Sequence, residues 1–259
     1  MKNPSFPSLA GGSFLPGRLL ALPSWVFPGS LADNCRFLAG RADEAGLLFL
    51  ETASSLAYSA DDIPPDLGRL PLRFHLHLPL DLPWEMPAEA ARICCLLLEK
   101  AACLHPGRAV LHPPPLQNGI GRALPLFLEN VAARGRDPGI FLLENTREND
   151  LRSLASLASD YGLRFCLDLG HILAYGQERL LEEDAILIRT ELLHLSAPGP
   201  DRDAHLPLTV LDAGGMALAR RLIRASPPQA VIMLELFHWP QVEMSLPLVR
   251  QWLECAACP

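Results

Sequence analysis

The sequence predicts an eight-stranded (β/α)8 TIM barrel of the α/β class, and three observations support it. The length of 259 residues is close to the roughly 250 that such a barrel takes. Eight strand-like segments recur about every 25–40 residues, the size of one βα unit. Their residues are mostly apolar in continuous runs, as expected of parallel strands covered on both faces. No linker divides the chain, so we expect one domain over residues 1–259, with 1–16 as a loose N-terminal arm.

The expected elements alternate along the chain. Strands are predicted at residues 18–22, 46–50, 72–78, 109–112, 140–144, 164–168, 191–195 and 230–236. Helices are predicted at residues 31–38, 87–104, 122–133, 178–183, 217–225 and 246–255, with a further helix that ends before Gly162. Pro87 suits a first helical turn, and Asn149 or Asp150 could cap the helix before Gly162. The connection at 52–70 is long, polar and Pro-containing. Because such loops are uncommon unless functional, we expect it to cap the site.

Composition argues against several classes of protein. The formal net charge is −7, and without a basic run a general nucleic-acid surface is not expected, although a local basic patch is compatible with the sequence. No apolar run reaches the ~18 residues that cross a bilayer. Pro4, Pro7 and Pro16, together with Gly11 and Gly12, interrupt any stretch resembling a signal peptide. We therefore expect a cytoplasmic protein with no membrane partner.

The seven cysteines do not form a disulfide framework. Four lie in apolar runs and are expected to be buried thiols: Cys94, Cys95, Cys103 and Cys166. Cys255 and Cys258 have CxxC spacing, but no second pair accompanies them. A packed or frayed terminus is the simpler interpretation of this pair than a metal or redox site.

Residues able to bind metals gather at the ends of the predicted strands. The nine candidates are His77, His112, Glu144, Asp168, His171, His194, Asp203, His205 and Glu235. In a barrel the carboxyl ends of the strands share the face on which active sites lie. Imidazole and carboxylate ligands together suit zinc, manganese or iron, and a carboxylate can bridge two cations. The pattern predicts two or three divalent metal ions in one centre.

The sequence supports some of these candidate metal ligands more strongly than others. A single histidine at a strand end is more often a hydrogen-bonded core residue than a ligand. Glu144 and Glu235 are harder to explain in that way, because a buried ionised carboxylate is costly unless it is paired or bound to metal. Asp203 and His205 are the weakest candidates, since their loop could simply be exposed.

Two side chains of the third strand compete for one role. His75 and His77 share the inward face, so either could be the ligand. His77 lies nearer the strand end and is preferred, which leaves His75 as a core residue or a neighbour of the ligands. Glu51, at the end of the second strand, is expected at the rim of the site.

Two motifs carry a resemblance to a known superfamily. Residues 142–146 (Leu-Leu-Glu-Asn-Thr) and 166–171 (Cys-Leu-Asp-Leu-Gly-His) resemble the fifth- and sixth-strand motifs of the xylose-isomerase-like barrels. That superfamily includes endonuclease IV-type AP endonucleases and sugar epimerases. The resemblance runs from about Arg73 to Leu236.

The endonuclease branch implies a three-metal site. By that resemblance one metal would be held by His77, His112 and Glu144. Glu144 would bridge to a second metal, held by Asp168, His194 and Glu235. The third would be held by His171, Asp203 and His205. The chain departs from the endonucleases, which usually have Asp-Arg-His where this chain has Asp-Ala-His at 203–205. It is also acidic overall and lacks obvious DNA-inserting loops.

The single-metal epimerases imply a smaller set: Glu144, Asp168, His194 and Glu235. This chain has those four and five further candidates. The surplus favours phosphoester chemistry over isomerisation.

A narrower resemblance rests on residues 74–84 (Phe-His-Leu-His-Leu-Pro-Leu-Asp-Leu-Pro-Trp) and on His112-Pro113-Pro114. Both look like segments of the cobamide-remodelling phosphodiesterases of this superfamily. That resemblance implies hydrolysis of the nucleotide-loop phosphodiester of a corrinoid, a small-molecule substrate rather than nucleic acid. Glu144 and Glu235 are the expected catalytic carboxylates, and Asp81 and Trp84 are candidates for substrate binding.

Two alternatives remain open at this point. A sugar-phosphate isomerase or epimerase would use Glu144 and Glu235 to move protons beside one metal. A corrinoid- or metal-binding protein without turnover would use the same ligands. The sequence does not fix the metal, the cobamide or the oligomeric state.

Overall fold

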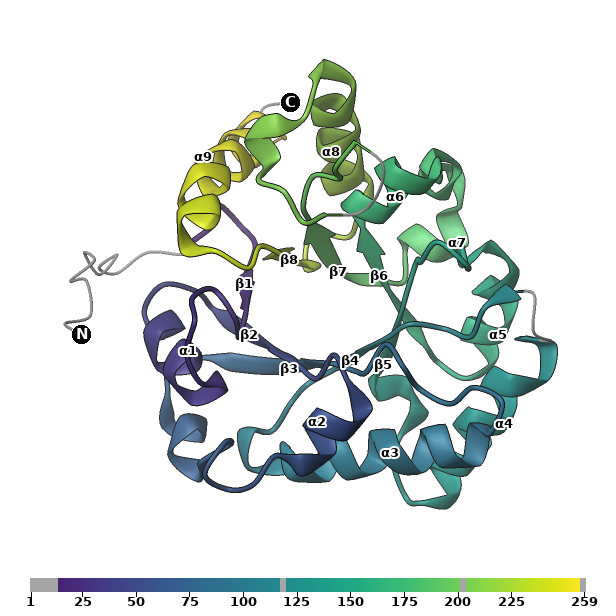
Figure 1. Cartoon of the computed structure of the whole chain (residues 1–259). Helices are drawn as coiled ribbons and strands as arrows, with labels where there is room; N and C mark the ends of the chain where they lie inside the picture. The colour runs from purple at the N-terminus through teal and green to yellow at the C-terminus, as the bar shows by residue number, and fades with distance from the viewer. Residues whose placement is uncertain (1–13, 117–119, 201–203, 257–259) are drawn as a thin grey trace.

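Eight parallel strands close into a barrel in the computed structural model, which describes residues 14–116, 120–200 and 204–256 (Figure 1). The strands are β1 (Leu20–Pro23), β2 (Glu44–Leu48), β3 (Arg73–His77), β4 (Ala109–Leu111), β5 (Phe141–Glu144), β6 (Arg164–Asp168), β7 (Thr190–Leu195) and β8 (Val231–Leu234). Each strand pairs with the next, and β1 pairs with β8 to close the ring. The predicted fold class is confirmed.

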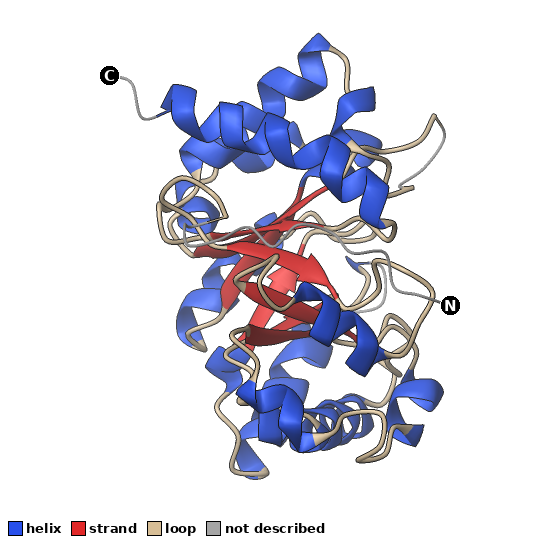
Figure 2. Ribbon diagram, turned by 90° about the vertical axis from the view of Figure 1, so that its left-hand side faces the viewer, coloured by secondary structure: helices blue, strands red, loops and turns tan. Residues whose placement is uncertain are grey.

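Helices surround the barrel, as Figure 2 shows from the side. They are α1 (Leu31–Leu38), α2 (Thr52–Ala57), α3 (Pro87–Lys100), α4 (Ile120–Ala133), α5 (Ala155–Asp160), α6 (Leu169–Tyr175), α7 (Asp184–Leu187), α8 (Ala213–Ala225) and α9 (Trp239–Ala256). Short 3-10 turns join them: η1 (Pro65–Arg69), η2 (Ala102–Leu104), η4 (Pro138–Ile140), η5 (Arg152–Leu154), η6 (Glu178–Glu182) and η7 (Leu208–Val210). None of the helices in the described part of the chain is long and apolar enough to cross a membrane.

The apolar core has two layers. The larger one lies between the strands and the helices, where strand residues such as Leu47 and Leu143 pack beneath helix residues such as Leu97 and Phe127. The smaller layer fills the barrel interior: Ala21, Val110, Leu142, Cys166, Leu192, Val231 and Met233. The polar residues at the carboxyl ends of the strands lie directly above this inner apolar layer, which is called the floor of the barrel below.

Several predicted boundaries are wrong. The second strand begins at Glu44, two residues before the predicted start, because the buried Glu44 interrupts the apolar pattern. The segment predicted as a helix at 178–183 is the 3-10 turn η6. Asn149 and Asp150 do not cap α5, because η5 intervenes. The last helix begins at Trp239 rather than 246, since Pro247 lies inside it and Pro ordinarily predicts a helix start or break.

The long connection after β2 is not structureless, because α2 and η1 lie within it. Asp81 holds its start: the backbone N–H and the hydroxyl of Thr52 both donate to Asp81 Oδ1 at 2.8 Å. The N-terminal arm also differs from the prediction at its end, because Leu15 is fully buried. Residues 1–13 lie outside the described residues.

The described cysteines are free thiols: Cys35, Cys94, Cys95, Cys103 and Cys166. Cys94, Cys95 and Cys166 are buried as predicted, whereas Cys103 is only half-buried. Cys258 lies outside the described residues, so the CxxC prediction is untested.

Candidate metal centre

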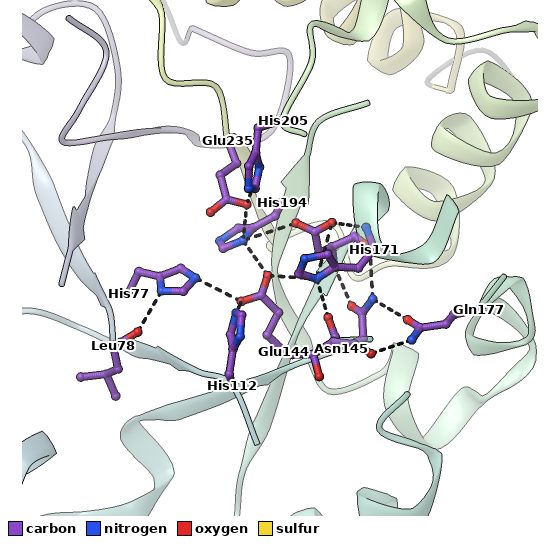
Figure 3. Close-up of polar contacts among 12 residues, drawn as sticks. His77, Leu78, His112, Glu144, Asn145, His171, Gln177, His194, His205 and Glu235 are labelled. Carbon is purple, nitrogen blue, oxygen red and sulfur yellow. Dashed lines mark hydrogen bonds and ion pairs between the residues drawn. The ribbon is translucent and has the colours of Figure 1, made fainter. Parts of the chain in front are cut away.

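The carboxyl ends of the strands bring six of the predicted metal-binding residues into one cluster: His77, His112, Glu144, Asp168, His194 and Glu235 (Figure 3). Side chains alternate along a strand, so a residue two positions beyond an inner-core residue points the same way. Five strands follow this rule, each with an inner-core residue followed two positions later by a polar one: Val110 and His112, Leu142 and Glu144, Cys166 and Asp168, Leu192 and His194, Met233 and Glu235. The period of the strand therefore sets the direction of each candidate ligand.

His194 lies at the middle of three carboxylates. Its Nδ1 atom is 3.1 Å from Glu144 Oε1, 3.1 Å from Glu235 Oε2 and 3.8 Å from Asp168 Oδ2. The four side chains are buried, and one ligand atom from each lies within 4.8 Å of the others. A single N–H cannot point at three oxygens at once, whereas a cation attracts all of them. This arrangement fits a metal coordination shell.

Glu144 connects that cluster to a second one. Its Oε2 atom is 3.3 Å from His77 Nε2 and 3.0 Å from His112 Nε2, while its Oε1 atom faces His194. The two oxygens of one carboxylate thus face different sets of imidazoles. This is the geometry that a carboxylate bridge between two cations requires.

The hydrogen bond of His77 fixes which nitrogen faces the centre. Its Nδ1 atom lies 3.1 Å from the carbonyl oxygen of Leu78, which can only accept, so Nδ1 carries the hydrogen. In a neutral ring Nε2 then presents a lone pair towards Glu144 Oε2. Two acceptors at this distance repel unless a proton or a metal ion lies between them. A backbone carbonyl that orients a histidine in this way is usual at metal sites.

The pKa values show how charge is shared without a metal. Burial raises the pKa of Asp168 to about 7, opposed only in part by His171. Burial alone would also raise the pKa of Glu144, but His194 and His112 outweigh it and hold that pKa well below its usual range. Burial alone would lower the pKa of His194, yet Cys166, Glu235 and Glu144 raise it well above its usual value. The imidazoles thus compensate Glu144, whereas Asp168 lacks a sufficient compensating charge.

Two oxygen atoms in the centre fit a bound cation directly. Glu144 Oε2 and Asp168 Oδ2 are buried and make no regular hydrogen bond among the described residues. Buried carboxylate oxygens without partners cost several kcal/mol unless something compensates them. Divalent ions on Glu144, Asp168 and the surrounding imidazoles would supply that compensation, so the residues present fit the predicted metals.

An amide network holds β5 and β6 in place beneath the centre. The backbone N–H of Asp168 donates to Asn145 Oδ1 at 2.8 Å, and Asn145 Nδ2 donates to Gln177 Oε1 at 2.9 Å. Gln177 Nε2 in turn donates to the carbonyl of Thr146 at 2.7 Å. Gln177 was not found from the sequence, because it lies outside any strand and a single glutamine has no distinctive spacing. Its burial is the signal that identifies it.

The third predicted ligand group is only partly described. Asp203 lies outside the described residues. His171 is buried, and its Nδ1 atom donates to the carbonyl of Asn145 at 2.7 Å. His205 is a quarter exposed, with Nδ1 3.7 Å from Glu235 Oε2. Among the described residues, neither histidine belongs to a compact group of three ligand atoms. Their role in binding a third metal therefore stays a prediction.

His75 has a different partner from His77. Its Nδ1 atom lies 2.6 Å from Glu44 Oε1, deeper in the barrel, and both side chains are buried. Glu44 Oε2 also contacts Arg108 at 3.4 Å. His75 is thus paired beneath the centre, and His77 is the histidine of β3 that joins it. Glu44 was missed because the predicted strand began after it.

Cys166 lies closer to the centre than a purely apolar role implies. Its sulfur shares a compact group with Glu144 and His194. Burial raises the pKa of this thiol to about 12, so it is protonated at neutral pH.

Three cavities open near the centre. The aromatic cavity, about 610 Å³, includes Trp25, Tyr58 and Phe237 and lies at the ends of β1, β2 and β8. The motif cavity, about 510 Å³, includes Trp84 and His112 and lies at the ends of β3, β4 and β5. The arginine cavity, about 310 Å³, is lined by several residues that include three basic ones: Arg147, Arg152 and Arg179.

The two predicted substrate-binding residues have different surroundings. Trp84 lines the motif cavity and packs on Phe127, with ring centroids 5.2 Å apart. Asp81 is not among the described lining residues of the three cavities and instead binds Thr52. Trp84 thus lines a cavity that a ligand could enter, whereas the substrate-binding role of Asp81 stays a prediction.

Comparison with known proteins supports the fold. No family model matches the chain, and no curated protein matches its sequence. Endonuclease IV from Thermus thermophilus superposes with a TM-score of 0.68 at 22% identity, covering 91% of this chain and 99% of that one. The two chains share the closed eight-stranded (β/α)8 barrel fold. A D-tagatose 3-epimerase-like protein has a TM-score of 0.64 at 20% identity, covering 92% and 98% of the two chains. The IolI protein with a binding zinc atom has a TM-score of 0.65 at 12% identity, covering 92% and 96%.

Proposed function

We propose that this protein is a metal-dependent phosphodiesterase that hydrolyses the nucleotide-loop phosphodiester of a cobamide. The observation that carries the proposal is the position of Glu144 between two ligand clusters. One cluster contains His77 and His112, and the other contains Asp168, His194 and Glu235. A centre built for two cations suits phosphoester hydrolysis, in which attacking and leaving oxygens both need compensating charge.

The residues of the chain would divide the work as follows. When bound, the divalent ions would supply a water of lowered pKa and positive charge for the phosphoryl oxygens. Glu144 would set the separation of the two cations, and Glu235 would hold the second one beside His194. The imidazoles of His77 and His112 would bind in the neutral form, and the Leu78 carbonyl would keep the hydrogen of His77 on Nδ1, so that Nε2 is free for the metal. The buried floor of the barrel would exclude bulk water from below.

The motif cavity supports the corrinoid part of the proposal. The residues that carry the narrower resemblance, at 74–84 and 112–114, are far apart in sequence. Trp84 and Leu82 from the first segment nevertheless line the same cavity as His112 and Pro114 from the second. His112 also contacts Glu144, so this cavity opens onto the proposed metal centre. A large, partly apolar substrate with a single phosphodiester suits such a pocket.

The basic residues that line the cavities help to decide whether the substrate is a corrinoid or DNA. Among the described lining residues of the two larger cavities there is neither Lys nor Arg. Duplex DNA needs several phosphate contacts and binds with a steep salt dependence. The arginine cavity is where such contacts could form, although Arg152 already pairs with Asp150 at 2.6 Å.

One observation favours a second candidate, a sugar-phosphate isomerase or epimerase. The group of Glu144, Asp168, His194 and Glu235 is complete by itself and could hold one metal without the others. In that case Glu144 and Glu235 would move protons beside a single ion.

One experiment separates these functions. The protein, reconstituted with zinc, manganese or iron(II), is incubated with excess cobamide, with abasic-site duplex DNA and with a panel of ketoses and their phosphates, and products are followed by chromatography. We expect many turnovers of cobamide cleavage. Efficient nicking of DNA with an intact cobamide would identify an endonuclease instead. Ketose interconversion would identify an epimerase, and cobamide binding without product would identify a binding protein.

A further inference from the structure

The aromatic cavity is separate from every residue assigned to the metals or to the motif cavity. Its volume of about 610 Å³ lies within the range of small-molecule sites, about 300–1,000 Å³. Three aromatic side chains come from distant parts of the chain: Trp25 after β1, Tyr58 after α2 and Phe237 after β8. Trp25 is 47% exposed, which is unusual for so large an apolar side chain. An exposed aromatic wall beside an active site is typical of a place where a ligand packs.

Phe237 connects this cavity to the metal centre. Its ring meets the imidazole of His205 edge-on, with centroids 4.8 Å apart. His205 Nδ1 lies 3.7 Å from Glu235 Oε2. The contacts of Phe237 with His205 and of His205 with Glu235 thus place the aromatic cavity beside the proposed metal centre.

Contacts behind the lining residues hold the cavity in shape. Tyr58 packs on the fully buried Phe49, with ring centroids 5.6 Å apart. Lys100 Nζ donates to the backbone carbonyl of Tyr58 at 2.7 Å. Ser24 Oγ accepts from the backbone N–H of Leu48 at 3.1 Å, which leaves the Ser24 hydroxyl hydrogen to be donated. The walls are thus set before any ligand arrives.

The polar groups of the cavity select the ligand chemistry. Glu51 is the one charged side chain among its described lining residues. Ser54 Oγ donates to Glu51 Oε2 at 3.1 Å, which orients the carboxylate. A carboxylate accepts hydrogen bonds and repels anions, and aromatic side chains stack on flat rings. This combination fits an aromatic ring that carries N–H donors and no negative charge of its own.

We propose that the aromatic cavity binds the nitrogen heterocycle of one arm of the substrate, with Trp25 and Tyr58 packing on the ring and Glu51 accepting from its N–H group. The inference rests on the proposed function in one respect, namely that the heterocycle belongs to a phosphodiester. The motif cavity, on the opposite arc of the barrel rim, would then receive the other arm.

The test uses the full-length protein freed of metal and titrated by calorimetry with adenosine, with purine riboside, which lacks the exocyclic amino group, and with ribose. Adenosine should bind and ribose should not. Trp25→Ala should weaken adenosine binding about tenfold, the scale of one base stacked on an aromatic ring. Glu51→Gln should weaken adenosine binding and leave purine riboside binding unchanged. Ile188→Ala, a 72% exposed residue before β7 at the other end of the barrel, is the matched control and should bind adenosine like the unaltered protein.

Equal binding of adenosine and ribose, or adenosine binding unaffected by Trp25→Ala and Glu51→Gln, would overturn the inference. Tyr58→Leu provides a second aromatic variant if Trp25→Ala does not fold. No metal or hydrolysis enters this measurement. A protein that binds adenosine as described but cleaves no diester would contradict the proposed function alone, whereas cobamide cleavage without this binding pattern would contradict the subsite alone.

Discussion

The Nδ1 atom of His194 lies 3.1 Å from Glu144 Oε1, while the other carboxylate oxygen of Glu144 faces His77 and His112. Among the described residues, Glu144 is the one side chain shared by the group of His77, His112 and Glu144 and the group of Glu144, Asp168, His194 and Glu235. Removing it should disturb every charge that the two clusters hold.

Substitution of Glu144 tests this relationship. Glu144→Ala should lower kcat for diester cleavage at least ~100-fold, because loss of the bridge affects both compensating charges. His205→Ala should cost much less, since His205 is a quarter exposed and, among the described residues, belongs to neither ligand group. Steady-state kinetics of the two metal-loaded variants provide the comparison. Small and equal effects on kcat would show that Glu144 does not bridge.

The stability of the metal-free protein should depend on pH through Asp168. Its pKa is raised from 3.8 to about 7, so between these values the folded protein holds a proton that the unfolded chain has lost. The folded state is then favoured at low pH, and this stabilisation is lost as pH rises through about 7. Thermal unfolding in the presence of a chelator should give a lower Tm at about pH 8 than at about pH 6.

Asp168→Asn is the control for that measurement, because an amide does not titrate. It should flatten the change in Tm across this pH interval. Zinc or manganese should raise the Tm of the unaltered protein most at the higher pH, where Asp168 is ionised. A metal-free protein that gains stability from about pH 6 to about pH 8 would contradict the assigned charge state.

Gln177 should act on the centre without touching a metal. Gln177→Leu removes the hydrogen bonds to Asn145 and Thr146 that hold the ends of β5 and β6. Losses of this kind typically reduce metal affinity about 10–100-fold. Competition with a chromophoric chelator would measure the change. Unaltered affinity in Gln177→Leu would mean that the backbone alone positions Asp168.

The floor beneath the centre leaves no room at Gly46. A Cβ atom there would lie 2.7 Å from His75 Nε2 and 3.0 Å from the methyl carbon of Met233. Gly46→Ala should therefore reduce the free energy of unfolding by about 1–3 kcal/mol, as overpacking does. Gly107→Ala is the matched control, since nothing lies within 4 Å of its Cβ. Denaturant unfolding of both variants would decide, and equal stabilities would show that His75 and Met233 can move aside.

The sequence predicted the barrel because short apolar strand segments recur at the spacing of βα units, and most of the later ones end in a residue that can bind metal. It also predicted which residues meet, since the carboxyl ends of barrel strands share a face. It did not predict α6, because Asp168 serves both as a candidate ligand and as the cap that accepts from the backbone N–H of His171 at 2.6 Å. From the sequence Asp168 was interpreted only as a metal ligand, so its second role as the N-terminal cap of α6 was missed.

Other parts of the site depend on contacts between residues far apart in the chain, and the spacing of residues along the sequence does not predict such contacts. Glu44 and His75 are paired across neighbouring strands, so only the register of β2 against β3 brings them together. The aromatic cavity combines Trp25 and Phe237, more than 200 positions apart in the sequence. Asp81 lay in a motif that suggested substrate binding, yet its carboxylate holds Thr52 at the start of α2.

The number and positions of bound metals test the central claim most directly. Protein reconstituted with zinc, manganese or iron(II) would be analysed for metal per chain, and the ions located by anomalous X-ray scattering. We predict at least two ions, one between Glu144 and the pair His77 and His112, the other among Glu144, Asp168, His194 and Glu235. Less than one equivalent after reconstitution, or ions bound away from these residues, would contradict the account.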